Sequence, residues 1–317
     1  MIKTNVPLSD YSNYHIGGPA RYFFEVKNLS DLRAGLVEWD KIRPTLAKGA
    51  DKIFILGGGT NLVIDDRGFG GLVIRTDFNF IEHDDFAITF GSGAPMSEAV
   101  NFCTEAGLAG FAWAGGLPGS VGGAVRGNAG AFGGEIKDNL REVASFNLKT
   151  RQSRRFSAAE CRFGYRTSYF KTQAGQDEVI VLAVFDFEAG DRSKIAQEVR
   201  EREGYRQSHQ PLEYPSAGST FKNIDVRQAP AELIEAYRQS IKNDPFPVIP
   251  VARLLSDAGL RGKQIGAAMF SEKHPNFIVN LGGATAKDVL ALIDLARKTI
   301  GKRFGVDLEL EIMYLPY

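Results

Sequence analysis

Cysteine and histidine are both scarce in this sequence, and their scarcity excludes several kinds of site. The two cysteines, Cys103 and Cys161, lie far apart and form no CxxC pair, which argues against a disulfide scaffold and a zinc site. We interpret each as a small side chain of the hydrophobic core, in a protein of the reducing cytoplasm. The four histidines form no HExxH pattern, so we expect no catalytic metal.

Net charge and long apolar runs are also missing. The 38 basic and 38 acidic side chains cancel, which leaves no general positive field for nucleic acid. The first residues hold no apolar run of the signal-peptide kind. No segment approaches the roughly 20 apolar residues of a transmembrane helix. We therefore expect a cytoplasmic protein that neither inserts into a membrane nor binds nucleic acid.

What is present is the composition and rhythm of a mixed α and β protein. The 317 residues allow two or three domains, and 44% hydrophobic with 24% charged residues is typical of a globular chain. Short β-branched and aromatic runs between glycine turns predict strands. Helices are predicted over residues 96–107, 191–210 and 285–305, the last opened by a capping box. Residues 306–315 alternate as a closing strand, and the expected fold class is α+β.

Two stretches are rich in glycine. Residues 116–135, GLPGSVGGAVRGNAGAFGGE, carry charge only at Arg126 and Glu135. A flexible linker would carry serine and charge, whereas the small apolar residues here predict a backbone packed against a flat ring or another backbone. The second stretch, LGGGTN at residues 56–61, lies between two predicted strands. It suits either a nest of main-chain N–H groups for a phosphate or a tight hairpin without a ligand.

The two familiar nucleotide motifs are absent. No pair of nearby glycines continues as GxGxxG, so a Rossmann dinucleotide site is excluded. The Walker P-loop requires a lysine after its last glycine, and Gly127 is followed by Asn128. Any nucleotide cofactor must therefore be held in another way.

Together with several further segments, these stretches resemble the UDP-N-acetylenolpyruvoylglucosamine reductase family. The matching motifs follow the family's order over nearly the whole chain. Besides residues 116–135 they are PLSDYSNYHIGGPARYFFEV, ILGGGTNLVI, CRFGYRTSYFK, PLEYPSAGSTFKN, SEKHPNFIVNLGGATAKDVL and FGVDLELEI. The bulky insert that type I members carry before the catalytic serine is not evident, so the chain resembles type II.

The resemblance implies a two-lobed FAD-binding module of the vanillyl-alcohol-oxidase type followed by an α+β substrate-binding domain. We place the lobes at residues 1–77 and 78–210 and the third domain at 211–317, with an inserted segment at about 224–250. The implied cofactor is non-covalent FAD, the reductant NADPH, and the substrate a UDP-sugar enolpyruvyl ether of peptidoglycan synthesis. In this family the nicotinamide visits the substrate pocket, which fits the absence of a Rossmann motif.

Three catalytic residues are carried over from the family's motifs. Arg166 in GYRTS matches the arginine that meets the substrate carboxylate, and a planar, permanently charged guanidinium suits that role. Ser219 in AGSTF matches the proton donor. The catalytic carboxylate follows Gly305 of the FGV motif by six residues, which selects Glu311 over Glu309.

The resemblance also implies the binding residues. The residues expected at the FAD pyrophosphate are Gly57, Gly58, Gly59, Thr60 and Asn61. Those expected along its ribityl chain and ring are Pro118, Gly119, Ser120, Gly122, Gly123 and Asn128. Those expected at the UDP-sugar substrate are Tyr165, Lys222 and Asn223. His15 departs from the family, which more often has arginine at that position.

Two rival functions stay open at this point. The first is a different flavoprotein oxidoreductase on the same fold, because one fold hosts several chemistries. The second is a flavin-binding protein without catalysis that acts as a partner of another protein. The filled positions Arg166, Ser219 and Glu311 argue against both.

Overall fold

The computed structural model describes residues 1–47 and 49–317, whose contacts form two compact units. The first unit comprises Met1–Val6, Ala20–Gly58 and Gly70–Tyr205. The second unit comprises Pro7–Pro19, Gly59–Phe69 and Arg206–Tyr317. The chain therefore passes between the units several times, whereas the three lobes expected from the sequence are each continuous. That three-part division remains a prediction.

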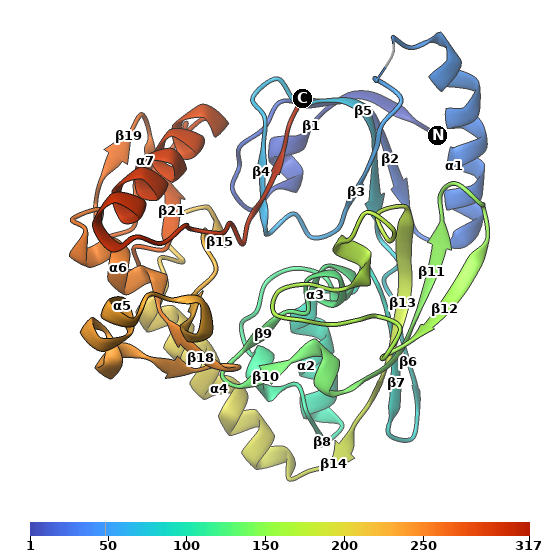
Figure 1. The fold of residues 1–317 in the computed structure, drawn as a ribbon. Coiled ribbons are helices and arrows are strands. Elements are labelled where there is room, and N and C mark those ends of the chain that lie inside the picture. The colour runs from blue at the N-terminus through green and yellow to red at the C-terminus, as the bar shows by residue number, and fades with distance from the viewer. Residues whose placement is uncertain (48) are drawn as a thin grey trace. The chain divides into compact units, whose positions relative to one another are not determined.

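Two sheets build most of the first unit (Figure 1). One has the order β1-β2-β5-β3, with strands β1 (Lys3–Pro7), β2 (Pro19–Val26), β5 (Phe69–Thr76) and β3 (Ile53–Leu56). The other has the order β12-β11-β13-β7-β6, with strands β12 (Ser153–Ser157), β11 (Leu140–Asn147), β13 (Glu178–Asp186), β7 (Ala87–Gly91) and β6 (Ile81–Asp84). The central strand β13 is apolar almost throughout because both of its faces are covered.

Helix α1 (Leu29–Ile42) joins the two sheets of the first unit into one core. The helix begins where the Asn28 side chain accepts a hydrogen bond from the Asp31 amide at 2.8 Å. Its buried face follows the helical spacing and consists of Leu32, Leu36 and Trp39. The residues of both sheets in the same buried cluster are Phe24, Val26, Leu72, Ile74, Phe146, Val179 and Val181.

The remaining elements of the first unit carry the long glycine-rich stretch. Helices α2 (Met96–Glu105) and α3 (Val121–Gly127) share a core with the five-stranded sheet, in which the Phe111 and Phe185 rings meet edge to face at 5.0 Å. The short strand pairs are β8 (Leu108–Ala109) with β14 (Glu188–Ala189), and β9 (Gly130–Ala131) with β10 (Gly134–Glu135). Helix α4 (Arg192–His209) begins after Asp191, whose carboxylate accepts the Ser193 amide at 2.8 Å and so caps the start of the helix.

The second unit packs helices α6 (Val251–Asp257) and α7 (Ala286–Phe304) on a four-stranded sheet. The sheet has the order β15-β21-β20-β19, with strands β15 (Ser216–Ser219), β21 (Phe277–Asn280), β20 (Ala268–Phe270) and β19 (Gln264–Ile265). The capping box of α7 is confirmed, with Thr285 and Asp288 bonding each other's main-chain amides. The helix ends at Gly305, which adopts a left-handed φ of 66°.

The closing strand and the hairpin alternative are both wrong. Only β22 (Met313–Leu315) is extended at the end of the chain, because the preceding residues bend and make a single bridge between Leu310 and Phe221. Strand β3 pairs parallel with β5, while β4 (Leu62–Ile64) pairs parallel with β22. The glycine turn at residues 56–61 therefore joins two different sheets instead of closing a hairpin.

The inserted segment at about 224–250 folds as a small substructure of the second unit. Its strands β16 (Ile224–Asp225), β18 (Pro247–Ile249) and β17 (Lys242–Asn243) form a three-stranded sheet. Between the strands lies helix α5 (Ala231–Ala236). Leu233 is the buried residue of that short helix and joins the core of the second unit.

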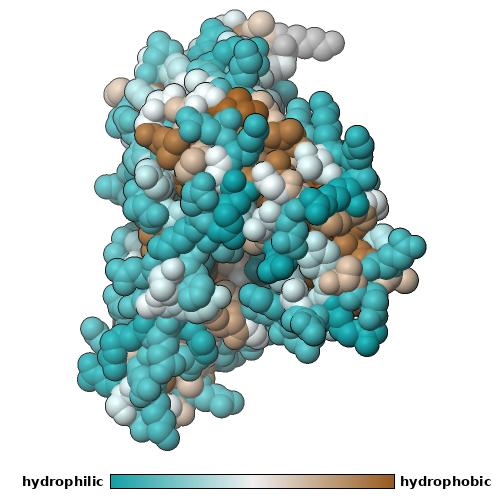
Figure 2. All heavy atoms as spheres, turned by 90° about the vertical axis from the view of Figure 1, so that its left-hand side faces the viewer, coloured by the Kyte–Doolittle hydropathy of each residue, from teal (hydrophilic) through white to brown (hydrophobic). Residues whose placement is uncertain are grey.

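The surface carries few large apolar side chains. Figure 2 shows a face covered mainly by hydrophilic residues, with hydrophobic ones in smaller patches. Among the described residues, no helix combines the length and the apolar character needed to cross a bilayer.

An ion pair between the buried Asp65 and the exposed Arg67 lies near β4 and β22 in the second unit. The Asp65 carboxylate accepts hydrogen bonds from the Arg67 Nε at 2.9 Å and from the Tyr314 hydroxyl at 2.6 Å. The hydrogen bond from Arg67 is the main cause that holds the pKa of Asp65 well below its usual range. The same carboxylate raises the pKa of Tyr314 to about 12.

We expect Asp65→Asn to lower the free energy of unfolding by about 1–3 kcal/mol near neutral pH, since it removes hydrogen bonds to a charged group. The folded-state pKa of Asp65 is depressed, so its stabilisation is complete above the unfolded-chain value of about 4 and is lost as the pH falls through the folded value. Urea unfolding of both proteins at about pH 7 and about pH 2, where much of the stabilisation by Asp65 is lost, measures this difference. An equal gap at both pH values would contradict the assignment.

Candidate active site

The two glycine-rich stretches meet in the first unit. A Cβ placed on Gly58 would lie 2.9 Å from the Cα of Gly119 and 3.0 Å from the amide nitrogen of Ser120. A Cβ on Gly57 would lie 2.9 Å from the Ser120 hydroxyl oxygen. The two main chains are thus packed directly against each other, and any side chain at Gly58 would force them apart. This contact joins segments about sixty residues apart in the chain.

The long stretch is an ordered structure, as its apolar residues predict. The Ser120 side chain caps α3 by accepting from the Gly123 amide at 3.4 Å. Ahead of the helix, the Met96 amide donates to the Gly119 carbonyl at 2.9 Å, and the Gly122 amide donates to the Ser92 carbonyl at 2.8 Å. A slack linker is therefore excluded by these main-chain hydrogen bonds.

The close packing of Gly58 against Gly119 suits a cofactor that is bound directly by the main chain. Main-chain amides without neighbouring Cβ atoms suit a pyrophosphate and a flat ring. The buried Ser92 hydroxyl has no hydrogen-bond partner among the described residues. Ser92 packs closely against Gly122, because a Cβ placed on Gly122 would lie 2.7 Å from the Ser92 Cβ. Of the other residues predicted along the flavin, Pro118 and Gly123 are exposed. The residues present are compatible with FAD.

Asn128 has surroundings that the sequence does not reveal. The side chain is fully buried, and its Nδ2 donates to the Glu135 carboxylate at 3.1 Å and to the Gly164 carbonyl at 3.0 Å. Its Oδ1 accepts from the Lys137 amide at 3.2 Å. Each polar atom of the side chain therefore has a partner within the protein, and the predicted contact of Asn128 with the flavin stays a prediction.

Arg166 lies on a tight turn of the first unit. Gly164 and Thr167 exchange two main-chain hydrogen bonds at 3.0 and 3.2 Å, which close the turn around Tyr165 and Arg166. Arg166 has a left-handed φ of 55°, and its Nη2 donates to the Gly130 carbonyl at 2.6 Å. The guanidinium carbon stands 5.1 Å from the centre of the Tyr165 ring. The arginine is therefore held by the glycine-rich stretch and by its neighbouring ring.

Ser219 ends strand β15 in the second unit. It pairs with Phe277 of β21, and the register shifts between Ser216 and Ser219. The shift falls at Gly218, which has a φ of 79°, a value that favours glycine. This bulge turns the half-buried Ser219 out of the regular strand alternation.

The structure brings Ser219 and Glu311 onto neighbouring backbones. The Glu311 amide donates to the carbonyl of Thr220 at 2.9 Å, and the Lys222 amide donates to the carbonyl of Glu309 at 2.9 Å. The segment after Ser219 therefore runs beside the segment that carries Glu311, although the two are far apart in the sequence. Sequence spacing alone contains no sign of this pairing.

Glu309 and Glu311 have different surroundings. The Glu309 side chain is largely exposed and forms an ion pair with Lys222. Glu311 is half-buried, and its carbonyl accepts the Asn61 side-chain amide at 3.1 Å. The charge of Lys222 is thus already paired within the protein, while the Asn223 side chain accepts the Val251 amide at 3.2 Å, at the start of α6.

The glycine turn at residues 56–61 also reaches the segment of Glu311. A Cβ on Gly59, whose φ is 65°, would lie 1.9 Å from the Tyr11 carbonyl oxygen. Thr60 is half-buried, and the next residue, Asn61, accepts the Met313 amide at 3.0 Å through its own carbonyl. In the second unit Asn61 therefore fastens the main chain on either side of Ile312.

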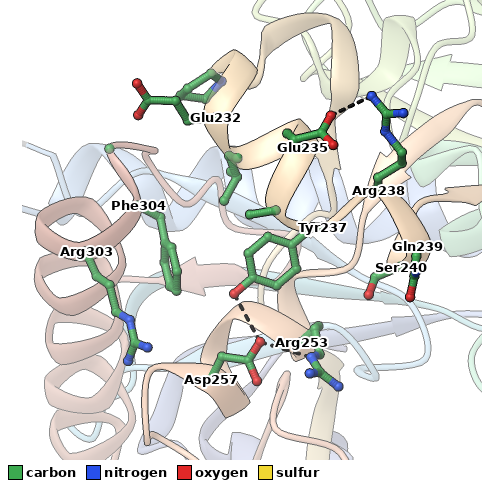
Figure 3. Close-up of a pocket in the computed structure, with 14 residues that line it drawn as sticks. Glu232, Glu235, Tyr237, Arg238, Gln239, Ser240, Arg253, Asp257, Arg303 and Phe304 are labelled. Carbon is green, nitrogen blue, oxygen red and sulfur yellow. Dashed lines mark hydrogen bonds and ion pairs between the residues drawn. The ribbon is translucent and has the colours of Figure 1, made fainter.

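A separate hollow of about 860 Å³ lies beside the inserted segment, and none of the predicted site residues lines it. Figure 3 shows the Tyr237 hydroxyl and the Arg253 side chain directed at the Asp257 carboxylate, each 3.0 Å away. Arg238 pairs with Glu235 at its rim. Two ion pairs of this hollow, Arg253 with Asp257 and Arg238 with Glu235, hold its charges within the protein, and we do not assign it to the chemistry.

Comparison with known proteins decides the family. Residues 45–147 match the FAD binding domain family, and residues 210–315 match the C-terminal domain of UDP-N-acetylenolpyruvoylglucosamine reductase. The reductase of Lactobacillus johnsonii is 37% identical over 98% of this chain and 93% of its own length. The chain belongs to the UDP-N-acetylenolpyruvoylglucosamine reductase family. The resemblance predicted from the sequence motifs is thereby confirmed.

Further relatives agree with this assignment. The reductase of Carboxydothermus hydrogenoformans is 36% identical over 98% of this chain and 93% of its own length. The crystal structure of the reductase from Thermus caldophilus matches the whole of both chains at 30% identity with a TM-score of 0.76. The predicted α+β fold with its FAD-binding module is confirmed, and the family member described here is an FAD-dependent oxidoreductase.

Proposed function

We propose that this chain reduces UDP-N-acetylglucosamine enolpyruvate to UDP-N-acetylmuramate with NADPH as the reductant. The observation that carries the proposal is the pairing of the Ser219 and Glu311 segments, made by the hydrogen bond from the Glu311 amide to the Thr220 carbonyl. It joins the segments that carry two of the three motif residues assigned to catalysis by the family resemblance. FAD, when bound and reduced by NADPH, would supply a hydride to the terminal carbon of the enolpyruvyl group.

Arg166 stabilises the charge that develops during hydride addition. The electron pair of the double bond moves to the adjacent carbon and spreads into the substrate carboxylate. A fixed guanidinium next to that carboxylate lowers the energy of the transition state more than that of the neutral alkene. The hydrogen bond to the Gly130 carbonyl holds the Arg166 fork in place, so less side-chain entropy is lost on binding.

Ser219 completes the addition by giving its hydroxyl proton to the same adjacent carbon. The balance is one hydride and one proton added across the carbon–carbon double bond, with the serine oxygen reprotonated from solvent before the next turnover. A serine hydroxyl is a weak acid, so its donation needs neighbouring support. Glu311, on the neighbouring segment, has the role of supporting the donating network.

The test is NADPH oxidation by the purified holoenzyme, followed at the nicotinamide absorbance with and without UDP-N-acetylglucosamine enolpyruvate. We expect rapid oxidation only with the substrate, with one UDP-N-acetylmuramate formed per NADPH. Bound FAD that NADPH reduces but that this substrate cannot reoxidise would overturn the proposal. Failure of NADPH to reduce the flavin, with alcohol-dependent oxygen uptake instead, would identify a different oxidoreductase of this fold.

The hollow beside the inserted segment provides a contrasting prediction. Tyr237→Phe removes one hydrogen bond to Asp257, and we expect it to lower the free energy of unfolding by about 1 kcal/mol. Substrate-dependent NADPH oxidation should be unchanged, because no proposed site residue lines the hollow. Urea unfolding and steady-state kinetics of the two proteins measure both effects. A loss of turnover in a folded variant would place Tyr237 in the active machinery.

A further inference from the structure

The turn that carries Arg166 is fastened to the glycine-rich stretch at three points. The Gly164 carbonyl accepts the Asn128 Nδ2 at 3.0 Å, and the Arg166 Nη2 donates to the Gly130 carbonyl at 2.6 Å. Behind the turn, the Ser168 hydroxyl donates to the Arg126 carbonyl at 2.7 Å. The end of α3 and the residues just after it therefore form the base on which Arg166 stands.

The Asn128 side chain of that base is hydrogen-bonded to the turn itself. It is fully buried, and its amide nitrogen uses one hydrogen for Gly164 and the other for Glu135. The Glu135 side chain is also buried and is paired with Lys137, 2.5 Å from its ammonium nitrogen. The Glu135 carboxylate accepts from Nδ2 and the Lys137 amide donates to Oδ1, so these partners fix the orientation of the Asn128 amide and direct its second hydrogen to the Gly164 carbonyl.

The backbone of the turn needs such support. Arg166 has a φ of 55°, a left-handed value that is unfavourable for a residue with a Cβ atom. A residue keeps such a conformation only where its surroundings hold it there. The bond from Asn128 to Gly164 acts two residues before Arg166, on the carbonyl at the opening of the turn.

We propose that Asn128 is a positioning residue that sets the guanidinium of Arg166 for the substrate carboxylate, and does not contact the cofactor. The proposal rests on the role assigned to Arg166 in the proposed function. It assigns to the asparagine an effect on substrate reduction and none on flavin reduction by NADPH. Asn128 itself has a left-handed φ of 44°, a conformation that asparagine, aspartate and glycine adopt most readily.

The decisive variant is Asn128→Asp, which keeps the shape and the left-handed preference but removes both donated hydrogen bonds. Rapid mixing separates the two half-reactions of the holoenzyme. We expect flavin reduction by NADPH to stay within about threefold of wild type, while reoxidation by UDP-N-acetylglucosamine enolpyruvate slows about 10- to 100-fold. Asn128→Gly removes the same bonds without burying a new charge and should act in the same direction.

Asn147→Asp is the matched control in the same unit. Asn147 also donates to a carboxylate, that of Glu178 at 2.8 Å, and also accepts main-chain amides, but it touches no predicted site residue. We expect both half-reactions of this variant to stay within about threefold of wild type. It therefore separates a general loss of stability from an effect on Arg166.

Arg166→Gln completes the experiment as the second arm of a double-mutant cycle. In that background Asn128→Asp should add no further slowing of reoxidation, since both act through one guanidinium. Fully additive effects would overturn the proposal, and so would loss of bound flavin in a folded Asn128→Asp or Asn128→Gly protein. Normal reoxidation in Arg166→Gln would instead refute the catalytic role of Arg166, and slowing in that variant alone would refute only the positioning role of Asn128.

Discussion

Replacing Ser219 by alanine is expected to slow substrate reduction by about 10²- to 10⁴-fold, the usual contribution of a general acid. Flavin reduction by NADPH should persist, because that step transfers a hydride and needs no proton from the serine. The fold should persist as well, since the half-buried Ser219 side chain stands at a bulge and not in the core. The variant would then hold reduced flavin in the presence of NADPH and substrate.

Stopped-flow absorbance of the flavin separates these two outcomes directly. Thr220→Val is the matched control, because Thr220 carries the neighbouring hydroxyl and valine replaces that hydroxyl by a methyl group. The main-chain carbonyl that accepts the Glu311 amide is retained in that variant. Slow reoxidation in Thr220→Val together with normal reoxidation in Ser219→Ala would show that Thr220, and not Ser219, donates the proton. Impaired flavin reduction in Ser219→Ala would refute its role as a donor.

The second large effect is expected at Gly58. An alanine there puts a carbon 2.9 Å from the Gly119 Cα, closer than carbon atoms pack, and the obstacle is main chain that cannot rotate away. Overpacking of this kind costs about 1–3 kcal/mol. If the strain falls on the bound state, FAD affinity drops by about 5- to 150-fold. We expect Gly58→Ala to be purified with less flavin and to regain activity only at high FAD concentration.

Fluorescence titration of the flavin-free protein with FAD measures this loss. Gly204→Ala is the control, because a Cβ on Gly204 meets nothing within 4 Å and alanine suits the interior of α4 better than glycine. Its FAD affinity should equal that of wild type. Equal affinity in Gly58→Ala would show that the close approach of the two glycine stretches has no part in holding the cofactor.

Local signals in the sequence predict many of the elements correctly. The capping box at Thr285 and Asp288 and the terminal Gly305 delimit α7, because caps and left-handed glycines act within one turn of a helix. The Asp191 cap of α4 is an equally local signal. The prediction of a closing strand was wrong because an alternating pattern indicates which side chains are buried and not whether the backbone pairs with another strand. Leu308 and Ile312 are indeed buried, yet the chain between them bends instead of pairing along its length.

The sequence motifs allowed us to predict the residues of the site, but not the hydrogen bonds that hold those residues in position. The motifs select Arg166, Ser219 and Glu311 by residue type and order, and these roles stay predictions. The bonds of Asn128 had only a faint signal, the single buried acid Glu135 in a stretch otherwise almost free of charge. Asn128 itself reads from the sequence as a cofactor contact, because an asparagine amide among glycines shows nothing of which carbonyl it will meet.

The sequence by itself determined the family and most of the element types, and it predicted the residue types of the chemistry. Tertiary structure alone decided that Gly58 packs on Gly119, that Asn61 reaches the Glu311 carbonyl, and that Asn128 reaches Gly164. The physical reason is one of range. Turn, cap and strand preferences act between residues a few positions apart, whereas these contacts join segments brought together only when the hydrophobic cores close.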